Sequence, residues 1–348
     1  GSNDSITLGT NRYYRKFQNR IQIFGEVNPK NGIVLWSQSY EKNHISGFGH
    51  YLTGITKLKN KLYISGVVGQ YKHTILKIGK DTLIRGSFVV ETDTVGNYIK
   101  HFHFYTDSLR GGFYSPGLSY IESIESDGQY LYIGGNFSDS LTWNSKRIGT
   151  SQILSGWSPQ SEIFIASLTS DLKPRWFYRP KVVSRNAMIN SRGISRFCTS
   201  NGYIYYSTLN GGMKLQFDST IVNIYETQDL LLLKMDYMGN VLWATGGNNN
   251  NINGYSNLYG LSAIEGETVF AAGTFMGTIS IDTFKRTMKS KYNDGLVTKI
   301  SDNAISRGYV KPGPYCAGDS IAIPYTLLCS YDLSNIFYAY LRNAYGDF

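Results

Sequence analysis

The sequence predicts an all-β fold made of repeated units, and two observations carry that prediction. The composition suits strands and turns, with 28 Tyr, 17 Phe and 37 Gly among 348 residues and only 17% charged residues. Long amphipathic helices normally need a larger share of Glu, Lys, Arg and Ala. Short segments of similar pattern also recur along the chain, which is the signature of a repeat architecture.

The first recurring segment is a turn that leads into a strand, which often ends in tryptophan. The copy at 238–243 reads Met-Gly-Asn-Val-Leu-Trp, and the copy at 30–36 reads Lys-Asn-Gly-Ile-Val-Leu-Trp. Glycine and asparagine favour turns, and the aliphatic residues that follow them favour a strand. Further copies lie at 95–99 and 171–176, with a weaker copy at 302–305.

Three further strand segments follow each of these turns in a fixed order. The second segment of the unit is a short apolar strand after a polar hairpin turn, the third alternates, and the fourth is more apolar and leads back to the tryptophan turn. The second segment lies at 62–66, 131–135, 204–207 and 269–273. The third lies at 6–8, 141–143, 215–217 and 279–281, and the fourth at 21–24, 163–165, 230–233 and 296–298.

Four antiparallel strands in a repeat of about 65 to 75 residues describe one blade of a β-propeller. A single blade cannot bury both of its faces, so neighbouring blades must stack on it. The chain begins at the third strand of a unit, and the segments 326–329 and 336–340 are in phase with the earlier hairpins. We therefore expect five blades in a ring closed by strands from both termini, with repeats in 1–304 and a closing hairpin in 305–348.

Three segments, 236–243, 269–275 and 279–281, resemble the SBBP-type propeller repeat of secreted Bacteroidetes surface proteins. The resemblance covers roughly residues 3 to 301 and implies a protein that is secreted or attached to the cell surface. The segment 315–326 resembles the start of the Ig-like domain that often follows such repeats. An alternative for 305–348 is therefore a truncated Ig-like domain, since a complete one needs about 100 residues.

The sequence contains no nucleophile elbow, Walker loop or HExxH motif, so we expect a binding or adhesion scaffold without catalytic activity and without a cofactor. A structural subunit of a surface or secretion assembly is one alternative. Another is a glycan-acting hydrolase or lyase that uses the neighbouring carboxylates Glu122 and Glu125.

Two loops, at 101–120 and 246–259, are longer than the fold requires, and long loops on a rigid scaffold often bind ligands. They combine aromatic rings with amide side chains, which would suit a protein or glycan partner at the cell surface, and outer-membrane or secretion components are further candidate partners. The candidate ligand-binding residues are Phe104, Tyr105, Phe113, Tyr114, Asn249, Asn251 and Tyr255.

Metal, nucleic-acid and membrane partners are not expected. His101 and His103 would share a strand face, but no third ligand lies near them in the sequence. The net charge of +9 comes from scattered lysines and arginines without a nucleic-acid signature. No run of about 18 apolar residues predicts a membrane span.

The cysteines leave the redox compartment open. Cys198 lies in an apolar strand and is expected to be a buried thiol, whereas Cys316 and Cys329 are a candidate disulfide that sequence alone does not show. Five Asp-Ser/Thr-aliphatic triplets resemble the O-glycosylation sequon of secreted Bacteroidetes proteins, which fits export. They begin at residues 4, 81, 107, 139 and 319.

Overall fold

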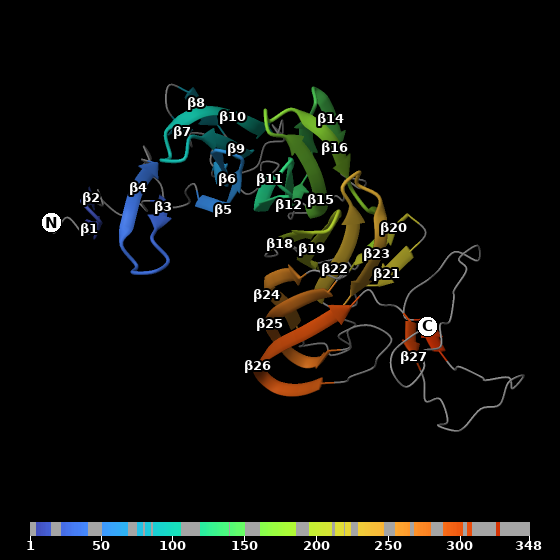
Figure 1. The fold of residues 1–348 in the computed structure, drawn as a ribbon. Coiled ribbons are helices and arrows are strands. Elements are labelled where there is room, and N and C mark those ends of the chain that lie inside the picture. The colour runs from blue at the N-terminus through green and yellow to red at the C-terminus, as the bar shows by residue number, and fades with distance from the viewer. Residues whose placement is uncertain are drawn as a thin grey trace, which may run out of the picture. The chain divides into compact units, whose positions relative to one another are not determined.

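A computed structural model shows an all-β chain, with no helix among the residues that it describes (Figure 1). By internal contacts the chain divides into two units, Gly1–Ile300 and Ser301–Phe348. The described residues are 5–14, 22–40, 51–68, 75–78, 81–84, 86–105, 119–138, 140–149, 161–185, 195–210, 213–218, 220–223, 229–246, 255–264, 268–279, 288–301, 305–307 and 325–327.

The first unit contains three four-stranded antiparallel sheets with the same strand order, followed by a three-stranded sheet. The first sheet contains β5 (Tyr51–Leu58), β6 (Lys61–Val68), β9 (Gly86–Thr92) and β10 (Tyr98–Tyr105). The second contains β11 (Ser119–Ser126), β12 (Tyr130–Ser138), β15 (Ser161–Thr169) and β16 (Pro174–Tyr178). The third contains β18 (Arg196–Ser200), β19 (Tyr203–Asn210), β22 (Asp229–Asp236) and β23 (Val241–Gly246). The fourth contains β24 (Tyr255–Ile264), β25 (Thr268–Ile279) and β26 (Met288–Ser301).

Two-stranded hairpins lie outside these sheets, and they correct one prediction. The alternating segments at 6–8, 141–143 and 215–217, expected as the third blade strand, form hairpins instead, because each turns back on its own partner. Asn144 and Ser145, for example, have φ of 48° and 62° between paired strands. Of the fourth expected segment, Ile279 ends β25 and residues 280–281 lie outside the described residues. The true remaining strand of each sheet precedes the polar hairpin turn. The hairpins are β1 (Ser5–Leu8) with β2 (Asn11–Tyr14), β7 (Ile75–Ile78) with β8 (Asp81–Ile84), β13 (Ser140–Trp143) with β14 (Lys146–Gly149), and β20 (Met213–Phe217) with β21 (Thr220–Asn223). The strand β17 (Lys181–Arg185) joins β20, and β3 (Gln22–Val27) pairs with β4 (Val34–Tyr40).

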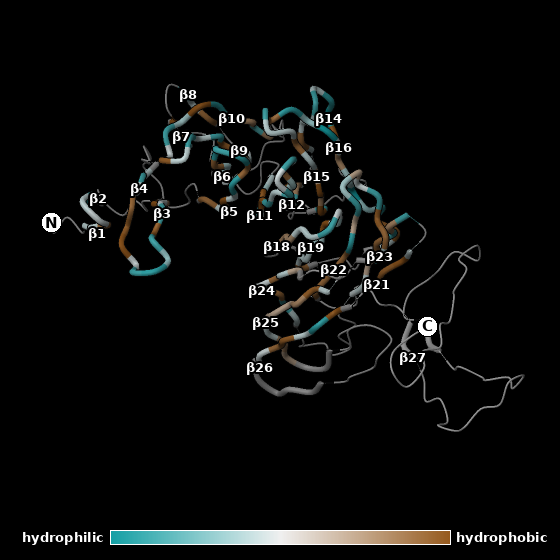
Figure 2. The backbone as a smooth tube through the Cα atoms, in the orientation of Figure 1, coloured by the Kyte–Doolittle hydropathy of each residue, from teal (hydrophilic) through white to brown (hydrophobic). Residues whose placement is uncertain are grey.

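The hydrophobic core lies between adjacent sheets, and Figure 2 shows hydrophobic segments along many of the strands. In β22, Leu231 and Leu233 join a cluster shared with the second sheet, while Leu230 and Leu232 join a cluster shared with the fourth. Alternate side chains of a strand point to opposite faces, so a run of four leucines is what a sheet buried on both faces requires.

The turn before the last strand is held by an aspartate in the first and third sheets, and by the hydroxyl of Thr169 in the second. Asp236 Oδ1 accepts the backbone N–H groups of Met238 and Asn240 at 2.9 Å each, and Asn240 Nδ2 donates to Asp236 Oδ2 at 2.7 Å. Gly239 adopts φ +95°, a left-handed conformation that favours glycine. The turn at 93–97 repeats this hydrogen-bond pattern, and the bonds from Asn97 lower the pKa of Asp93.

The tryptophan that ends a last strand packs on the turn of the next sheet. A Cβ added at Gly239 would lie 2.9 Å from the Trp176 ring, and one added at Gly96 would lie 3.0 Å from the Trp36 ring. Trp176 Nε1 also donates to Tyr237 O at 3.1 Å. At these two junctions, a tryptophan ring of one repeat therefore packs against a turn glycine of the next repeat.

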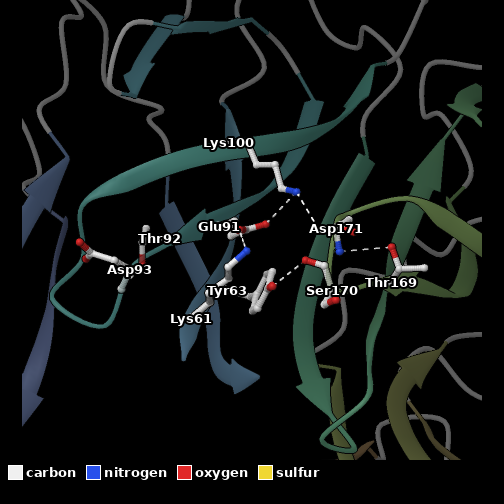
Figure 3. A network of polar contacts seen from close by, with 9 residues as sticks. All are labelled: Lys61, Tyr63, Glu91, Thr92, Asp93, Lys100, Thr169, Ser170 and Asp171. Carbon is white, nitrogen blue, oxygen red and sulfur yellow. Dashed lines mark hydrogen bonds and ion pairs between the residues drawn. The ribbon is translucent and has the colours of Figure 1, made fainter. Parts of the chain in front are cut away.

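The junction between the first and second sheets replaces this pair with charges (Figure 3). Lys100 occupies the tryptophan position, and its Nζ lies 3.4 Å from Asp171 Oδ1 and 3.3 Å from Glu91 Oε2. Lys61 Nζ lies 2.5 Å from Glu91 Oε1, and the Glu91 side chain is fully buried. In the turn opposite Lys100, Leu172 takes the place of the glycine with φ +60°.

In the second unit, β27 (Ile305–Arg307) pairs with β28 (Tyr325–Leu327). The rest of the expected closing hairpin, as well as Cys316 and Cys329, lies outside the described residues. Five blades and ring closure therefore stay predictions. Among the described residues, no helix is long and apolar enough to span a membrane.

Candidate functional site

A β-bulge recurs at one place in the leading strand of three sheets, where the leading strand is the first in chain order. One residue of each leading strand has no pairing partner, because the partners on either side of it are consecutive residues of the neighbouring strand. These residues are Thr53 in β5, Glu122 in β11 and Tyr259 in β24. Bulges re-aim side chains and often lie next to functional sites.

Glycine in the neighbouring strand makes the bulge possible. A Cβ added at Gly135 would lie 1.7 Å from Tyr120 O, and one added at Gly273 would lie 1.8 Å from Asn257 O. Gly66 takes the same place in the first sheet. The third sheet has Thr208 at this position.

In the third sheet, Ser195 stands at the corresponding place, directly before β18. The next residue, Arg196, pairs with Ser207, and Ser195 Oγ lies 3.1 Å from Thr208 Oγ1. The three bulge positions therefore carry a threonine, a glutamate and a tyrosine, and the corresponding place in the third sheet carries a serine without a bulge. We call Glu122, Ser195, Arg196 and Tyr259 the leading-strand row.

Glu122 is the acidic member of this row and joins the second sheet to the third. Ser195 Oγ donates to Glu122 Oε2 at 2.7 Å, and Asn136 Nδ2 donates to Glu122 Oε1 at 3.1 Å. Ser195 Oγ also lies 2.8 Å from the Tyr206 hydroxyl. A hydroxyl has one proton, so donation to Glu122 leaves the Ser195 lone pairs to accept from Tyr206.

Burial raises the pKa of Glu122 to about 7, although the bonds from Ser195 and Asn136 and the charge of Arg196 act in the opposite direction. Desolvation disfavours the charged carboxylate more than two neutral donors favour it. Asn136 is 1% exposed, and its Oδ1 has no hydrogen-bond partner among the described residues. Glu122 is therefore a carboxyl group that changes its charge near neutral pH.

Arg196 and Tyr259 continue the row toward the fourth sheet. Arg196 Nε donates to Tyr259 O at 2.8 Å, and Arg196 Nη1 donates to Ser195 O at 2.8 Å. The Tyr259 side chain is 46% exposed, while Glu122 and Arg196 are partly buried. The row therefore combines the Glu122 carboxyl, the Arg196 guanidinium and the Tyr259 ring. The hydroxyl groups of Ser195 and Tyr206 next to Glu122 are fully buried.

The expected carboxylate pair does not form. Glu122 faces the third sheet, whereas Glu125 Oε1 accepts from Thr56 Oγ1 of the first sheet at 3.2 Å. The two acids thus bond to different neighbouring sheets and do not form a joint pair of the kind that glycosidases use.

The residues expected to bind a ligand in the long loops are placed only in part. Phe104 is fully buried and stacks on Trp143 with ring centroids 5.6 Å apart, so it belongs to the core in this structure. Tyr105 ends β10 and Tyr255 begins β24, and their side chains are outside the described part of the chain. The remaining candidates, Phe113, Tyr114, Asn249 and Asn251, lie outside the described residues.

The histidine and cysteine candidates show no metal chemistry. His101 Nδ1 lies 2.8 Å from the Tyr98 hydroxyl and 3.6 Å from Asp81 Oδ2; burial lowers the pKa of His101, against the charge of Asp81. Within the described ranges, no three His, Cys, Asp or Glu side chains group together as a metal site. Cys198 is a buried free thiol, and burial raises its pKa to about 12.

Comparisons with known proteins give one named likeness. No family model matches the chain, and no curated protein matches it. Among solved structures, a chain described as a glycoside hydrolase is similar at 13% identity and a TM-score of 0.20, over 86% of this chain and 69% of that chain.

The expectation of a protein without catalytic activity is contradicted by this enzyme neighbour and is not carried further. At so low a TM-score the likeness itself carries no argument about activity. Known catalytic motifs and acids close together in the sequence were the signals for an active site. Neither signal can reveal a single carboxyl group whose pKa is raised by burial at a bulge.

Proposed function

We propose that this chain is a secreted or cell-surface β-propeller repeat protein that binds a glycan at the leading-strand row. Three four-stranded sheets of the same order, stacked through shared cores, support the propeller. The recurring segments and the Asp-Ser/Thr triplets described above support export.

The observation that carries the binding site is the leading-strand row, in which Glu122 and Tyr259 lie at bulges of the second and fourth sheets and Ser195 and Arg196 lie at the start of β18 in the third sheet. The Glu122 carboxyl and the Arg196 guanidinium offer the hydrogen-bonding groups that sugar hydroxyls need, and the exposed Tyr259 ring offers a surface for the apolar face of a sugar. The buried bonds from Ser195 hold Glu122 in place before any ligand arrives. The segment 101–120, which was expected to bind, ends within β11, the strand that carries Glu122.

Binding of the purified chain to a glycan array, followed by calorimetry, tests this proposal. We expect Glu122→Gln to weaken binding by about tenfold, the order expected for a lost hydrogen bond between the carboxyl group and a sugar hydroxyl. Glu125→Gln is the matched control, because it makes the same change on the same strand at a carboxyl that bonds to Thr56 of the first sheet instead of Ser195. Absence of glycan binding by the wild type, or equal losses in both variants, would contradict the proposal.

Glycan cleavage at the same row is a second candidate, favoured by the raised pKa of Glu122. A carboxyl that is protonated near neutral pH is suited to general acid catalysis. Release of new sugar ends should then fall as the pH rises above about 7, and Glu122→Gln should abolish it. Binding without any release at any pH would exclude cleavage and leave the binding proposal intact.

A further inference from the structure

The guanidinium of Arg196 is held in a fixed position between two sheets. Its Nε donates to Tyr259 O of the fourth sheet, and its Nη1 donates to the backbone oxygen of Ser195, both at 2.8 Å. An arginine oriented by backbone acceptors loses little conformational freedom when its remaining N–H groups bind a planar anion.

No carboxylate in the described part of the chain forms an ion pair with Arg196. Three other cations of the first unit have acidic partners: Lys61 and Lys100 pair with Glu91, and Arg179 lies 3.4 Å from Glu162. Arg175 instead lies over the Tyr130 ring, 3.3 Å from its centroid. The acid nearest in the row, Glu122, receives its hydrogen bonds from Ser195 and Asn136 rather than from Arg196. Arg196 therefore carries its charge without a directly ion-paired carboxylate among the described residues.

We propose that the ligand of the leading-strand row carries an anionic group, the carboxylate of a uronic acid or a sulfate ester, and that Arg196 binds it. This inference rests on the proposed function and specifies its ligand. Burial disfavours the charged form of Glu122, which reduces the repulsion between Glu122 and such a group. The chain's net charge of +9 also favours association with a polyanion.

Calorimetric titration with polygalacturonate, dextran sulfate and neutral dextran tests the inference. We expect the two acidic polymers to bind at least about tenfold more tightly than neutral dextran, and Arg196→Gln to remove that difference. Arg175→Gln is the matched control, because Arg175 stacks on Tyr130 of the second sheet and is not part of the row. It should change affinity less than about twofold, since a charge outside the interface adds little.

The outcomes separate the two proposals. If neutral and acidic glycans bind equally and Glu122→Gln weakens both, the binding site stands and the anionic ligand is wrong. If polymers of one acidic kind alone bind, that kind identifies the group as carboxylate or sulfate. If no glycan binds, both proposals fail.

A measurement on the wild type covers the case in which Arg196→Gln does not fold. Modification of arginine by phenylglyoxal, followed residue by residue with peptide mass spectrometry, should be slowed several-fold at Arg196 by the acidic polymer that binds, and not by neutral dextran. Equal modification of Arg196 with and without that polymer would overturn the inference.

Discussion

The second sheet meets a neighbouring sheet on each side, and each of these two junctions contains an acid. The two acids lie at opposite ends of the strands. Toward the first sheet, the acid Glu91 lies at the turn end and is paired with Lys61 and Lys100. Toward the third sheet, Trp176 packs on Gly239 at the turn end, and the acid Glu122 lies at the bulge end without an ion pair.

This difference separates an acid held by ion pairs from an acid held by neutral hydrogen-bond donors. Glu91 is fully buried, and both of its oxygens have a lysine partner, so its charge is satisfied within the junction. Glu122 has only hydroxyl and amide donors, and its pKa rises accordingly. The two junctions of the second sheet therefore differ in their role. The junction with the first sheet is held by ion pairs, and the junction with the third sheet carries the candidate site.

Adding a methyl group to the tryptophan–glycine contact should have the largest effect. Gly239→Ala places a Cβ 2.9 Å from Trp176 at φ +95°, so both a clash and backbone strain are introduced. We expect the free energy of unfolding to fall by about 3 kcal/mol, measured by urea denaturation. Gly202→Ala is the control, because it has φ +87° and no atom within 4 Å; it should lose only about 1 kcal/mol from strain.

Equal losses in the two glycine variants would show that backbone conformation alone matters. The tryptophan on the glycine would then contribute nothing specific to the junction between the second and third sheets.

Removing the charge of Glu91 should weaken the other junction. Glu91→Gln leaves Lys61 and Lys100 without a carboxylate, but both lysine side chains are 39% exposed and can be hydrated. We therefore expect a loss of about 2 kcal/mol, below the range for a fully buried pair. The difference between wild type and variant should shrink in 1 M NaCl, because salt screens partly exposed pairs.

A loss that does not depend on salt would contradict the ionic account of this junction. It would indicate that the shape of the Glu91 side chain, rather than its charge, supports the contact between the first and second sheets.

Much of the fold is predictable from local sequence. The turn with Asp236, Gly239 and Asn240 is encoded within five residues, so its copies could be recognised. The four leucines at 230–233 predict a strand that is buried on both faces. The hairpin at 140–149 was misassigned, because an alternating strand has the same local pattern whether it pairs within a blade or only with its neighbour.

The candidate site was visible only in part. Glu122 was singled out as an acid, but its partner Ser195 is 73 residues away and belongs to another sheet. The available signal was Gly135, a glycine inside a strand, which often marks a bulge or a close backbone approach. Which side chain the bulge re-aims, and what buries it, depends on the contact between sheets and cannot be read from one strand.

The smallest expected effect, and the sharpest test of the contrast between the two acids, is the pH dependence of stability that Glu122 contributes. Because the folded pKa of about 7 lies above the usual value of 4.5, the folded state binds more protons between these values. Stability from this group is therefore present at low pH and is lost as the pH rises through about 7.

Relative to Glu122→Gln, which does not titrate, the wild type should lose about 1 to 2 kcal/mol between pH 5 and pH 8 after allowance for partial exposure. Urea denaturation of both proteins across this range measures the difference. A difference that stays constant, or that grows in favour of the wild type as pH rises, would mean that Glu122 is charged in the folded protein, and the two acids would then no longer differ as the junctions suggest.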